Sequence, residues 1–465
     1  MKTKLRAGGI VAMAAALALV VAGCGDDDNG GADPTPTPDE TTAVDPTPEP
    51  DETDPPAVDR DPVTVTWWHN GVGEPLYSFW QGIADEFVAA NPHVTVNIEA
   101  IQNETLRNDV LPTAFQGGNA PDLFQSWGGG ELADWHAEGL VMNLSNVIPD
   151  TVAHIGAVGN SWAIDGAAYG LPFTFGPSGF WVNTEVWESA GLDSNNFPAT
   201  LDELFEAWNA IADAGYAPVA LGGQSGWPVG HWWYWSAVKT CSSAALLAAS
   251  NNHDWSDPCW VQAGENMDGI LTSVNGGVPF NQGWLATSAQ EGATSASGLV
   301  VTGMAAMQLM GVWDIGVMGG IYNEANDLPS DTLPPAFLSW FPFPNIPGGG
   351  GDANLMGGGD GFSVHTDAPV EAAELLAFIL SDSVQQRYAA MDNIPTNPNA
   401  FGSIPAGSAN LLPLAALENA GFVQLWLDAA YGGQIGTPMN NAITAFIGGQ
   451  GTPQDVVDAI VNAAG

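Results

Sequence analysis

Hydrophobic and polar positions alternate over Val63-Thr64-Val65-Thr66-Trp67-Trp68, and this pattern predicts a first strand. Apolar residues then recur at helical spacing from Leu76 to Phe87, and Asn91-Pro92 ends that segment. The two patterns continue to alternate, with strands expected at 63–68, 94–98 and 122–124 and helices at 76–87 and 106–115. Strands that alternate with helices are typical of βαβ units, so we expect an α/β fold with a largely parallel sheet.

Helical patterns dominate the middle and the end of the chain. Thr200-Leu201-Asp202-Glu203 predicts a capping box, in which Thr200 caps a helix and Glu203 reaches back to the cap. The apolar stripe that follows ends at Gly215. Further helices are expected at 371–380 and 456–461.

The start of the chain carries the features of an export signal. Three basic residues precede an almost wholly apolar stretch from Ile10 to Val21, and small residues follow it up to Cys24. This pattern predicts a signal peptide over residues 1–23. The small-residue end on a cysteine resembles a bacterial lipobox, with lipid carried on Cys24 of the mature chain. An ordinary signal peptide with an incidental cysteine is the alternative.

Residues 24–61 consist mainly of Asp, Pro, Thr, Glu and Gly and contain no aromatic side chain. Such a segment buries too little apolar surface to offset the entropy of ordering, and its Pro-Thr-Pro pairs favour extended geometry. We therefore expect an acidic linker that tethers the rest of the chain to the outer face of the cell membrane.

Acidic residues far outnumber basic ones: 52 Asp and Glu face seven Lys and Arg, for a formal net charge of −45. Binding to nucleic acid needs clustered Lys and Arg, and so does docking on anionic lipid, so the sequence excludes both partners. A cationic ligand is compatible with this balance. Alternatively, the excess of acidic residues keeps the protein surface soluble at high salt.

Cys241 and Cys259 follow Cys24 in the chain, with 17 residues between them. In an oxidising compartment this pair is expected to form a disulfide, and closing its loop would stabilise the fold by about 3 kcal/mol. Two free buried thiols are the alternative.

The chain has 19 tryptophans, and several stand beside polar residues where strands should end or loops begin. An indole offers a flat apolar face that matches the C–H face of a pyranose ring, while Asp, Asn, Gln and His can bond its hydroxyls. Pockets for small ligands combine apolar walls with a few placed polar groups in this way. A single tryptophan more often belongs to the core or its rim than to a ligand site, and the spacing of Trp67, Trp187 and Trp208 predicts core positions.

A series of short motifs extends over nearly all of residues 62–465. It comprises 63–70 with Ala84-Asp85-Glu86-Phe87 and Asn91-Pro92, Gly117-Gly118-Asn119-Ala120-Pro121-Asp122, Tyr169-Gly170-Leu171-Pro172-Phe173, Gly226-Trp227-Pro228 with His231-Trp232, Gly303-Met304-Ala305-Ala306-Met307, Met310-Gly311-Val312-Trp313 and Gly358-Gly359-Asp360-Gly361-Phe362. In this order the motifs resemble the family 1 extracellular solute-binding proteins of bacterial ABC importers. Within that family the chain is most similar to the carbohydrate binders.

The resemblance implies a periplasmic-binding-protein-like fold, in which two α/β lobes joined by crossing hinge segments enclose a ligand cleft. One lobe is expected over 62–173 and 304–358, and the other over 174–303 and 359–465. Open α/β sheets place ligands at the carboxyl ends of their strands, so the cleft should lie there. Closure is then a hinge motion about the ligand, to which both lobes contribute contacts.

The implied function is capture of a neutral sugar, a di- or oligosaccharide, and its delivery to the permease subunits of an ABC transporter. We expect a monomer without cofactor, metal or catalytic residues. Tryptophans would stack on sugar rings, and Asp360, Glu74 and Asn70 would bond hydroxyls, the carboxylates most strongly. The expected ligand-binding residues are His69, Asn70, Glu74, Gln125, Trp127, Trp227, His231, Trp284, Trp313 and Asp360.

Other classes of protein stay open on the sequence alone. A glycoside hydrolase also has a tryptophan-rich cleft, but the chain has no Gly-x-Ser-x-Gly or His-Glu-x-x-His signature and its histidines lack metal-ligand spacing. The same scaffold could bind a polyamine or a betaine through cation–π contacts, or present bound sugar as a sensor or adhesin. The glycine-rich runs 348–351 and 357–361 lack the Lys of a phosphate loop and are expected to be flexible connections.

Overall fold

The computed structural model describes residues 60–465 as one unit, in which the alternating strand and helix patterns build two large sheets, a small three-stranded sheet and a two-stranded hairpin. The expected signal peptide over 1–23, the lipidation site Cys24 and the linker up to residue 59 lie outside the described residues. Within 60–465, each helix is too short or too polar to cross a membrane.

The first sheet has five strands in the order β2-β1-β3-β13-β6. As predicted, β1 pairs in parallel with β2 and β3, whereas β13 runs antiparallel to β3 and β6. Because side chains alternate along a strand, Val65 and Trp67 lie in the core on one face while Trp68 packs on the other. The strands are β1 (Val63–His69), β2 (Val94–Ala100), β3 (Leu123–Ser126), β6 (Leu171–Pro172) and β13 (Gly361–Val364).

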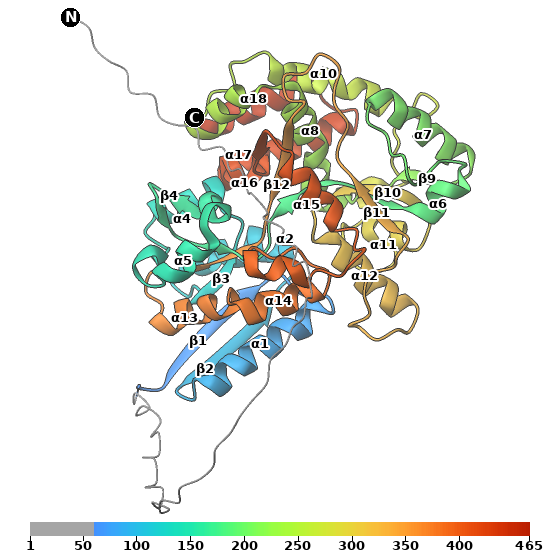
Figure 1. Ribbon diagram of the computed structural model, residues 1–465. Helices are drawn as coiled ribbons and strands as arrows, with labels where there is room; N and C mark the ends of the chain where they lie inside the picture. Colours follow the sequence, from blue (N-terminus) through green and yellow to red (C-terminus); the bar gives the residue numbers. More distant parts are fainter. Residues whose placement is uncertain (1–59) are drawn as a thin grey trace, which may run out of the picture. The chain divides into compact units, whose positions relative to one another are not determined.

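Helices cover both faces of the first sheet (Figure 1). On one face the Trp80 ring lies 5.7 Å from Trp67 and 6.0 Å from Tyr388, measured between ring centroids. On the other face Phe124 packs against Phe115 and Trp135. The covering helices are α1 (Leu76–Ala90), α13 (Val370–Ile379) and α14 (Asp382–Ala390) on the first face, and η1 (Leu106–Val110), α3 (Leu111–Gly117) and α4 (Gly129–Ala137) on the second.

The second sheet has four strands in the order β11-β8-β10-β9 and is also covered on both faces. The helix α7 begins with the predicted capping box: the Glu203 N–H donates to the Thr200 hydroxyl at 3.3 Å, and the Glu203 carboxylate accepts from the Thr200 N–H at 3.2 Å. The elements are β8 (Gly179–Asn183), β9 (Ala217–Val219), β10 (Ala305–Met310), β11 (Leu338–Phe341), α7 (Leu201–Asp213), α8 (Trp227–Thr240), α11 (Ala296–Val301) and α12 (Asp314–Ala325).

Three chain segments, 172–177, 357–361 and 391–397, lie side by side where the chain passes between the two large sheets. The backbone N–H groups of Phe173 and Thr174 donate to the Asp360 carbonyl at 2.9 and 3.3 Å. The Thr174 hydroxyl donates to the Ile394 carbonyl at 2.7 Å. Next to them lies a small sheet in the order β14-β12-β7, built from β7 (Gly176–Pro177), β12 (Asn354–Gly358) and β14 (Phe422–Gln424).

We call residues 60–172 and 361–390 the N-lobe and residues 177–358 and 411–465 the C-lobe, which corrects the expected division. Residues 304–358 do not join the first sheet, because β10 pairs with β8 and β9 of the second sheet. Residues 359–465 do not stay in one lobe, because β13 pairs with β3 and β6 of the first sheet. A short apolar strand such as β10 is buried on both faces in either sheet, so its sequence does not indicate its partner.

The glycine-rich runs are closely packed and are not the expected flexible connections. A Cβ atom on Gly359 would overlap the Thr174 carbonyl oxygen, and one on Gly351 would overlap the Val238 carbonyl oxygen. Glycine is therefore required here by the close approach of two backbones.

Cys241 and Cys259 form a disulfide, with Cα atoms 5.2 Å apart, between the end of α8 and the start of α10. This separation is usual for a disulfide, and the bond is the first of the two expected alternatives. The predicted last helix is α18. The remaining elements are α2 (Asn103–Thr105), η2 (Leu144–Asn146), α5 (Pro149–Ile155), η3 (Gly156–Trp162), β4 (Ala163–Ile164), β5 (Ala167–Ala168), α6 (Thr184–Ser189), η4 (Gly223–Ser225), α9 (Ser243–Asn252), α10 (Cys259–Leu271), η5 (Trp284–Ala286), η6 (Pro398–Ser403), α15 (Leu411–Glu418), α16 (Leu427–Tyr431), α17 (Gly433–Ile447) and α18 (Pro453–Ala464).

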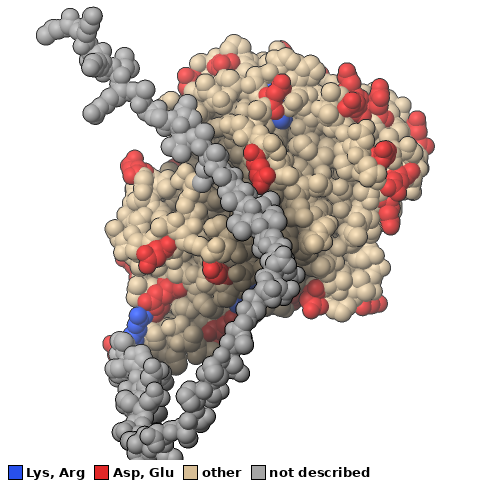
Figure 2. Space-filling model, in the orientation of Figure 1, with Lys and Arg blue, Asp and Glu red and all other residues tan. Residues whose placement is uncertain are grey.

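Acidic side chains are spread over the face of the molecule seen in Figure 2, with few basic ones among them. Each cation of residues 60–465 has a partner, so none is left to offset this charge. The contacts are Arg60 with Glu374 (2.7 Å), Arg387 with Glu86 (2.6 Å), Arg107 with Glu131 (3.2 Å) and Asp428 (3.0 Å), and Lys239 with the carbonyl oxygens of Asp352 (3.0 Å) and Asn354 (2.9 Å).

Candidate functional site

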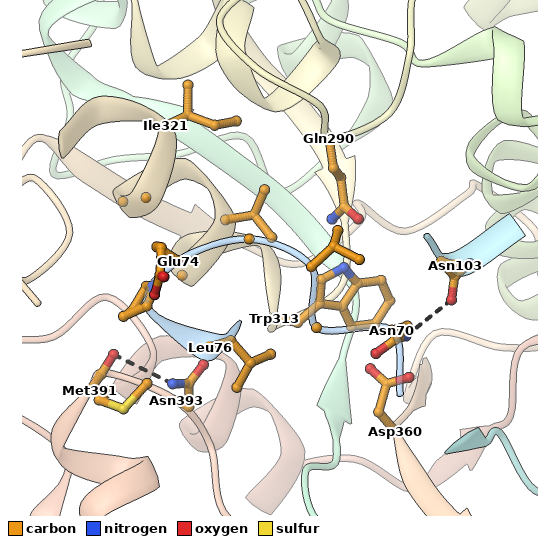
Figure 3. Close-up of a pocket in the computed structure, with 18 of the residues that line it drawn as sticks. Asn70, Glu74, Leu76, Asn103, Gln290, Trp313, Ile321, Asp360, Met391 and Asn393 are labelled. Carbon is orange, nitrogen blue, oxygen red and sulfur yellow. Dashed lines mark hydrogen bonds between the residues drawn. The ribbon is translucent and has the colours of Figure 1, made fainter. Parts of the chain in front are cut away.

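A cavity of about 780 Å³ lies between the two lobes, at the carboxyl end of β1. Its walls come from the β1–α1 loop and Trp127 of the N-lobe, from α8 and α12 of the C-lobe, and from the crossing segments around Asp360 (Figure 3). The volume is within the range of small-molecule binding sites. Because both lobes line the cavity, a ligand held there would touch both.

The end of β1 positions the N-lobe wall. Asn70 donates from its side-chain amide to the Asn103 side-chain carbonyl at 3.0 Å. His69 lies behind the wall, where its Nδ1 accepts from the Gly71 N–H at 3.1 Å. Burial lowers the pKa of His69 to about 4, so the ring is neutral and acts as an acceptor that fixes the loop.

Asp360 is the carboxylate at the centre of the site. It follows β12 on a crossing segment and accepts a hydrogen bond from the Gln125 amide at 2.9 Å. Burial raises the pKa of the Asp360 carboxyl to about 6, although hydrogen bonds from Gln125, Asn70 and Trp127 act in the opposite direction. Asp360 is therefore mainly ionised at neutral pH, and its carboxylate can accept further hydrogen bonds.

Aromatic rings of the C-lobe form one wall of the cavity. Trp227 opens α8, Trp313 precedes α12 and Trp426 precedes α16. The Trp313 ring centroid lies 6.2 Å from that of Trp227 and 5.6 Å from that of Trp426. His231 stacks on Trp426 at 5.2 Å, and burial lowers its pKa to about 4. The Trp313 ring is inclined by 52° to Trp227 and by 83° to Trp426, so the wall is aromatic and angular.

Trp127 lines the cavity from the N-lobe, and Arg107 lies over its ring, 5.1 Å from the ring centroid. Arg107 also bonds Glu131 of the N-lobe at 3.2 Å and Asp428 of the C-lobe at 3.0 Å. Its charge is thus neutralised by two carboxylates, and the ion pair with Asp428 joins the two lobes beside the cavity.

Two further polar contacts join the lobes at the edge of the site. The Trp227 indole N–H donates to the Glu104 carboxylate at 2.6 Å, and the Gln102 amide donates to the Glu291 carboxylate at 3.1 Å. Together with the Arg107–Asp428 ion pair, these contacts connect the two lobes beside the cavity.

The structure brings seven of the ten expected ligand-binding residues to the cavity wall: Asn70, Glu74, Trp127, Trp227, His231, Trp313 and Asp360. The other three do not line it. His69 and Gln125 lie behind Asn70 and Asp360, and Trp284 packs against Phe280 and Gly223. Contact of the seven with a ligand stays a prediction, and the three are corrected to supporting positions.

Several wall residues were not expected from the sequence. Trp426 stands close to Asp428 in the sequence, as Trp313 stands beside Asp314. A tryptophan near a polar residue is the pattern used to select the expected residues, so it could also have identified Trp426 and Asp428. Arg107 could have been found as one of the few cations. Other polar residues of the wall carry no such signal, among them Asn103, Glu104, Gln290 and Asn393.

In residues 60–465 no group of His, Cys, Asp and Glu side chains is arranged to hold a metal ion. What the site does offer is aromatic faces, amides and carboxylates directed at one enclosed volume. Such walls bind a ligand through stacking and hydrogen bonds.

Comparison with known proteins identifies the family. Residues 70–386 match the model of the bacterial extracellular solute-binding proteins. Among solved structures, the fold is similar to a chitin oligosaccharide binding protein (TM-score 0.74, 21% identity, covering 87% of this chain and 98% of that one). It is also similar to the GacH receptor of Streptomyces glaucescens (TM-score 0.67, 18% identity, covering 87% of this chain and 98% of that one). A third similar structure is RafE in complex with raffinose (TM-score 0.67, 19% identity, covering 86% of this chain and 100% of that one).

At these identities the structural likeness establishes the fold, which is that of the periplasmic binding proteins. A comparison with curated protein sequences finds no match. The family and these structural neighbours are substrate-binding proteins and not enzymes. The family model spans well over half of the chain, so this protein belongs to the bacterial extracellular solute-binding proteins.

Proposed function

We propose that this protein captures a neutral di- or oligosaccharide outside the cytoplasm for an ABC importer. The observation that carries the proposal is a single cavity between the lobes, lined by four tryptophans together with carboxylates and amides. Flat indole faces suit the C–H faces of pyranose rings, and the polar groups suit their hydroxyls. More than one indole favours a ligand with more than one ring.

The charges of the cavity wall support a ligand without negative charge. Glu74, Glu104 and Asp360 face the volume, while Arg107 already bonds two carboxylates. An anionic sugar would lose its hydration and meet no free cation there. The names of similar structures agree with a sugar, since they mention chitin oligosaccharide, acarbose and raffinose.

Closure is proposed to occur about the three crossing segments. A ligand favours the closed state only through contacts that are better there than in the open state. Trp127 and Asn70 would supply such contacts from the N-lobe, and Trp227 and Trp313 from the C-lobe. The Arg107–Asp428 ion pair would form in the same movement.

Delivery to membrane permease subunits and anchoring through Cys24 complete the proposal. A basic start, an apolar stretch and a small-residue end on cysteine support lipidation, and two acyl chains suffice for stable anchoring. Labelling cells with a radioactive fatty acid should mark the protein, and Cys24→Ser should abolish the label. Label that persists in Cys24→Ser would contradict lipidation at this residue.

The test of ligand class is a thermal-shift screen of the purified protein with neutral mono- and oligosaccharides, followed by calorimetry. A ligand at 100 times its dissociation constant adds about 2.7 kcal/mol to the free energy of unfolding, which should raise Tm by a few degrees. A shift with one oligosaccharide series, recovered unchanged, is the expected result. Absence of any shift with sugars would contradict the proposal.

A cationic ligand such as a polyamine or a betaine is the second candidate. The observation in its favour is the row of carboxylates in the cavity beside aromatic faces, a combination that also suits an ammonium group. Both compounds therefore belong in the same screen. A shift with them alone would retain the scaffold and replace the sugar.

A further inference from the structure

The cavity has a second end that the tryptophans do not line. We call the end formed by Trp127, Trp227, His231, Trp313, Asp360 and Trp426 the inner compartment, and the end formed by Leu76, Val317, Ile321, Leu333, Pro334 and Met391 the outer compartment. Figure 3 shows Trp313 and Asp360 together on one side, and Ile321, Leu76 and Met391 on the other. Aliphatic side chains line much of the outer compartment, and the carboxylates of Glu74, Glu324 and Asp331 lie among them.

Helix α12 connects the two compartments. Trp313 stands at its start, and Ile321 follows eight residues later, which is about 12 Å along a helix. Between them the helix has glycines at 316, 319 and 320, which weaken a helix and need another explanation. At Gly320 the explanation is the β1–α1 loop, because a Cβ atom there would overlap the Glu74 carbonyl oxygen. The helix therefore approaches the N-lobe closely beside the outer compartment.

Large apolar side chains surround the opening of the outer compartment and are exposed. Val72 of the N-lobe is 47% exposed, and Leu328 and Leu333 of the C-lobe are 41% and 46% exposed. Exposed apolar side chains that gather at a pocket mark a binding surface more often than scattered ones do.

The loop that carries Leu328 and Leu333 is held in place by α12. The buried Asn323 donates from its side-chain amide to the Thr332 backbone carbonyl at 2.7 Å. The backbone carbonyl of Asn323 accepts from the Leu328 N–H at 2.9 Å. The apolar opening is therefore a built part of the cavity wall.

We propose that the cavity takes a glycoside, with its sugar in the inner compartment and an apolar aglycone in the outer one. This inference rests on the proposed function, since it needs a sugar in the inner compartment. A sugar ring alone would leave the aliphatic walls in contact with water, whereas an aryl group would cover them. The side chains of Leu76, Val317 and Ile321 offer a hydroxyl no hydrogen-bond partner.

The experiment compares methyl and 4-nitrophenyl glycosides of glucose, galactose, xylose, maltose and cellobiose by calorimetry on the purified protein. For the sugar that binds, the nitrophenyl form should bind about tenfold more tightly than the methyl form. Val72→Ser and Leu333→Ser should remove most of that preference, so that the affinity for the nitrophenyl form falls toward that for the methyl form.

Matched controls exist in the C-lobe. Leu247 is 44% exposed and Val461 49%, and neither lines the cavity, so Leu247→Ser and Val461→Ser should keep the aryl preference. Equal affinity for methyl and nitrophenyl forms would overturn the inference alone, as would an aryl preference that survives Val72→Ser and Leu333→Ser. Failure of every glycoside of the panel to bind, in either form, would overturn the proposed function with it.

Discussion

At the residue scale, the decisive side chain is Trp313, whose ring is fixed by its neighbours. Trp227 and Trp426 pack against it, and the ring lies so close to Gly311 that a Cβ atom on that residue would overlap it. A fixed aromatic ring loses little conformational entropy when a ligand binds. The proposed stacking surface would therefore exist before a ligand arrives.

Trp313→Ala should weaken sugar binding about 30-fold or more, because truncating a central aromatic anchor costs 2 kcal/mol or more. Calorimetry with the sugar from the screen measures the change. Trp284→Ala is the control, since Trp284 lies outside the cavity wall, and its affinity should stay within about twofold of wild type. Equal losses in the two variants would contradict the placement of Trp313 in the site.

Asp360 should make sugar affinity depend on pH. Its pKa of about 6 means that acidification from pH 7 to 5 protonates the carboxyl and removes a charged acceptor, so affinity should fall over this interval. Asp360→Asn should bind more weakly and lose most of the dependence. The same pKa affects stability. The folded state binds this proton at a higher pH than the unfolded chain does, so lowering the pH through 6 should raise the contribution of Asp360 to the free energy of unfolding. A wild-type affinity that is constant from pH 8 to 5 would contradict the role of Asp360.

Residue types beside predicted strand ends identified much of the site but could not place every side chain. Trp313 and Trp284 look alike in sequence, as tryptophans in loop segments, yet only Trp313 reaches the cavity. Trp284 fills the space over Gly223 instead, a tertiary contact that no local pattern encodes. Gln125 was expected to contact the ligand. It lies on the fully buried strand β3, so its side chain is covered by the crossing segment and donates to Asp360 instead.

At the element scale, the crossing segments are the part of the fold where substitutions should matter most. Gly359→Ala should destabilise the protein by about 1–3 kcal/mol, because the added Cβ atom would overlap the Thr174 carbonyl oxygen. A lower Tm in thermal denaturation is the measurement. Gly402→Ala is the control, since a Cβ atom there would meet nothing within 4 Å. Two variants of equal stability would show that the crossing segments separate easily.

The disulfide between α8 and α10 should contribute about 3 kcal/mol by restricting the unfolded chain. The double variant Cys241→Ser, Cys259→Ser should therefore melt a few degrees below wild type. Reductant should lower the Tm of wild type to a similar value and leave that of the variant unchanged. If mass spectrometry finds the bond reduced while Tm does not move, the stabilising role is wrong.

Element types followed from local pattern, whereas the pairing of late strands did not. The strands β1 and β2, the helix α1 and the capping box of α7 were predicted because periodicity and caps are local properties. The strands β10 and β13 are short and fully buried, so hydrophobicity alone does not select a sheet for them. Their assignment needs the path of the chain through the crossing segments.

At the scale of the whole molecule, the charge distribution sets the conditions under which the protein is stable. The acidic surface of residues 60–465 meets only four cations, and Arg107 and Lys239 are buried or nearly so with their partners. Arg60 and Arg387 make ion pairs at the surface, where such pairs contribute little. Repulsion among carboxylates should therefore exceed attraction, and it opposes the compact state.

Salt should consequently raise Tm, most steeply at low concentration. The Debye length falls from about 30 Å at 0.01 M to about 10 Å at 0.1 M, so repulsion across the surface is largely screened within that interval. Thermal denaturation in NaCl and in KCl at equal ionic strength should give the same rise, because screening depends on ionic strength and not on the identity of the cation. A Tm that falls with salt would show that the surface pairs of Arg60 and Arg387 outweigh the repulsion, since screening weakens attraction and repulsion alike. A rise that begins only above about 1 M would instead point to preferential exclusion of salt from the protein surface.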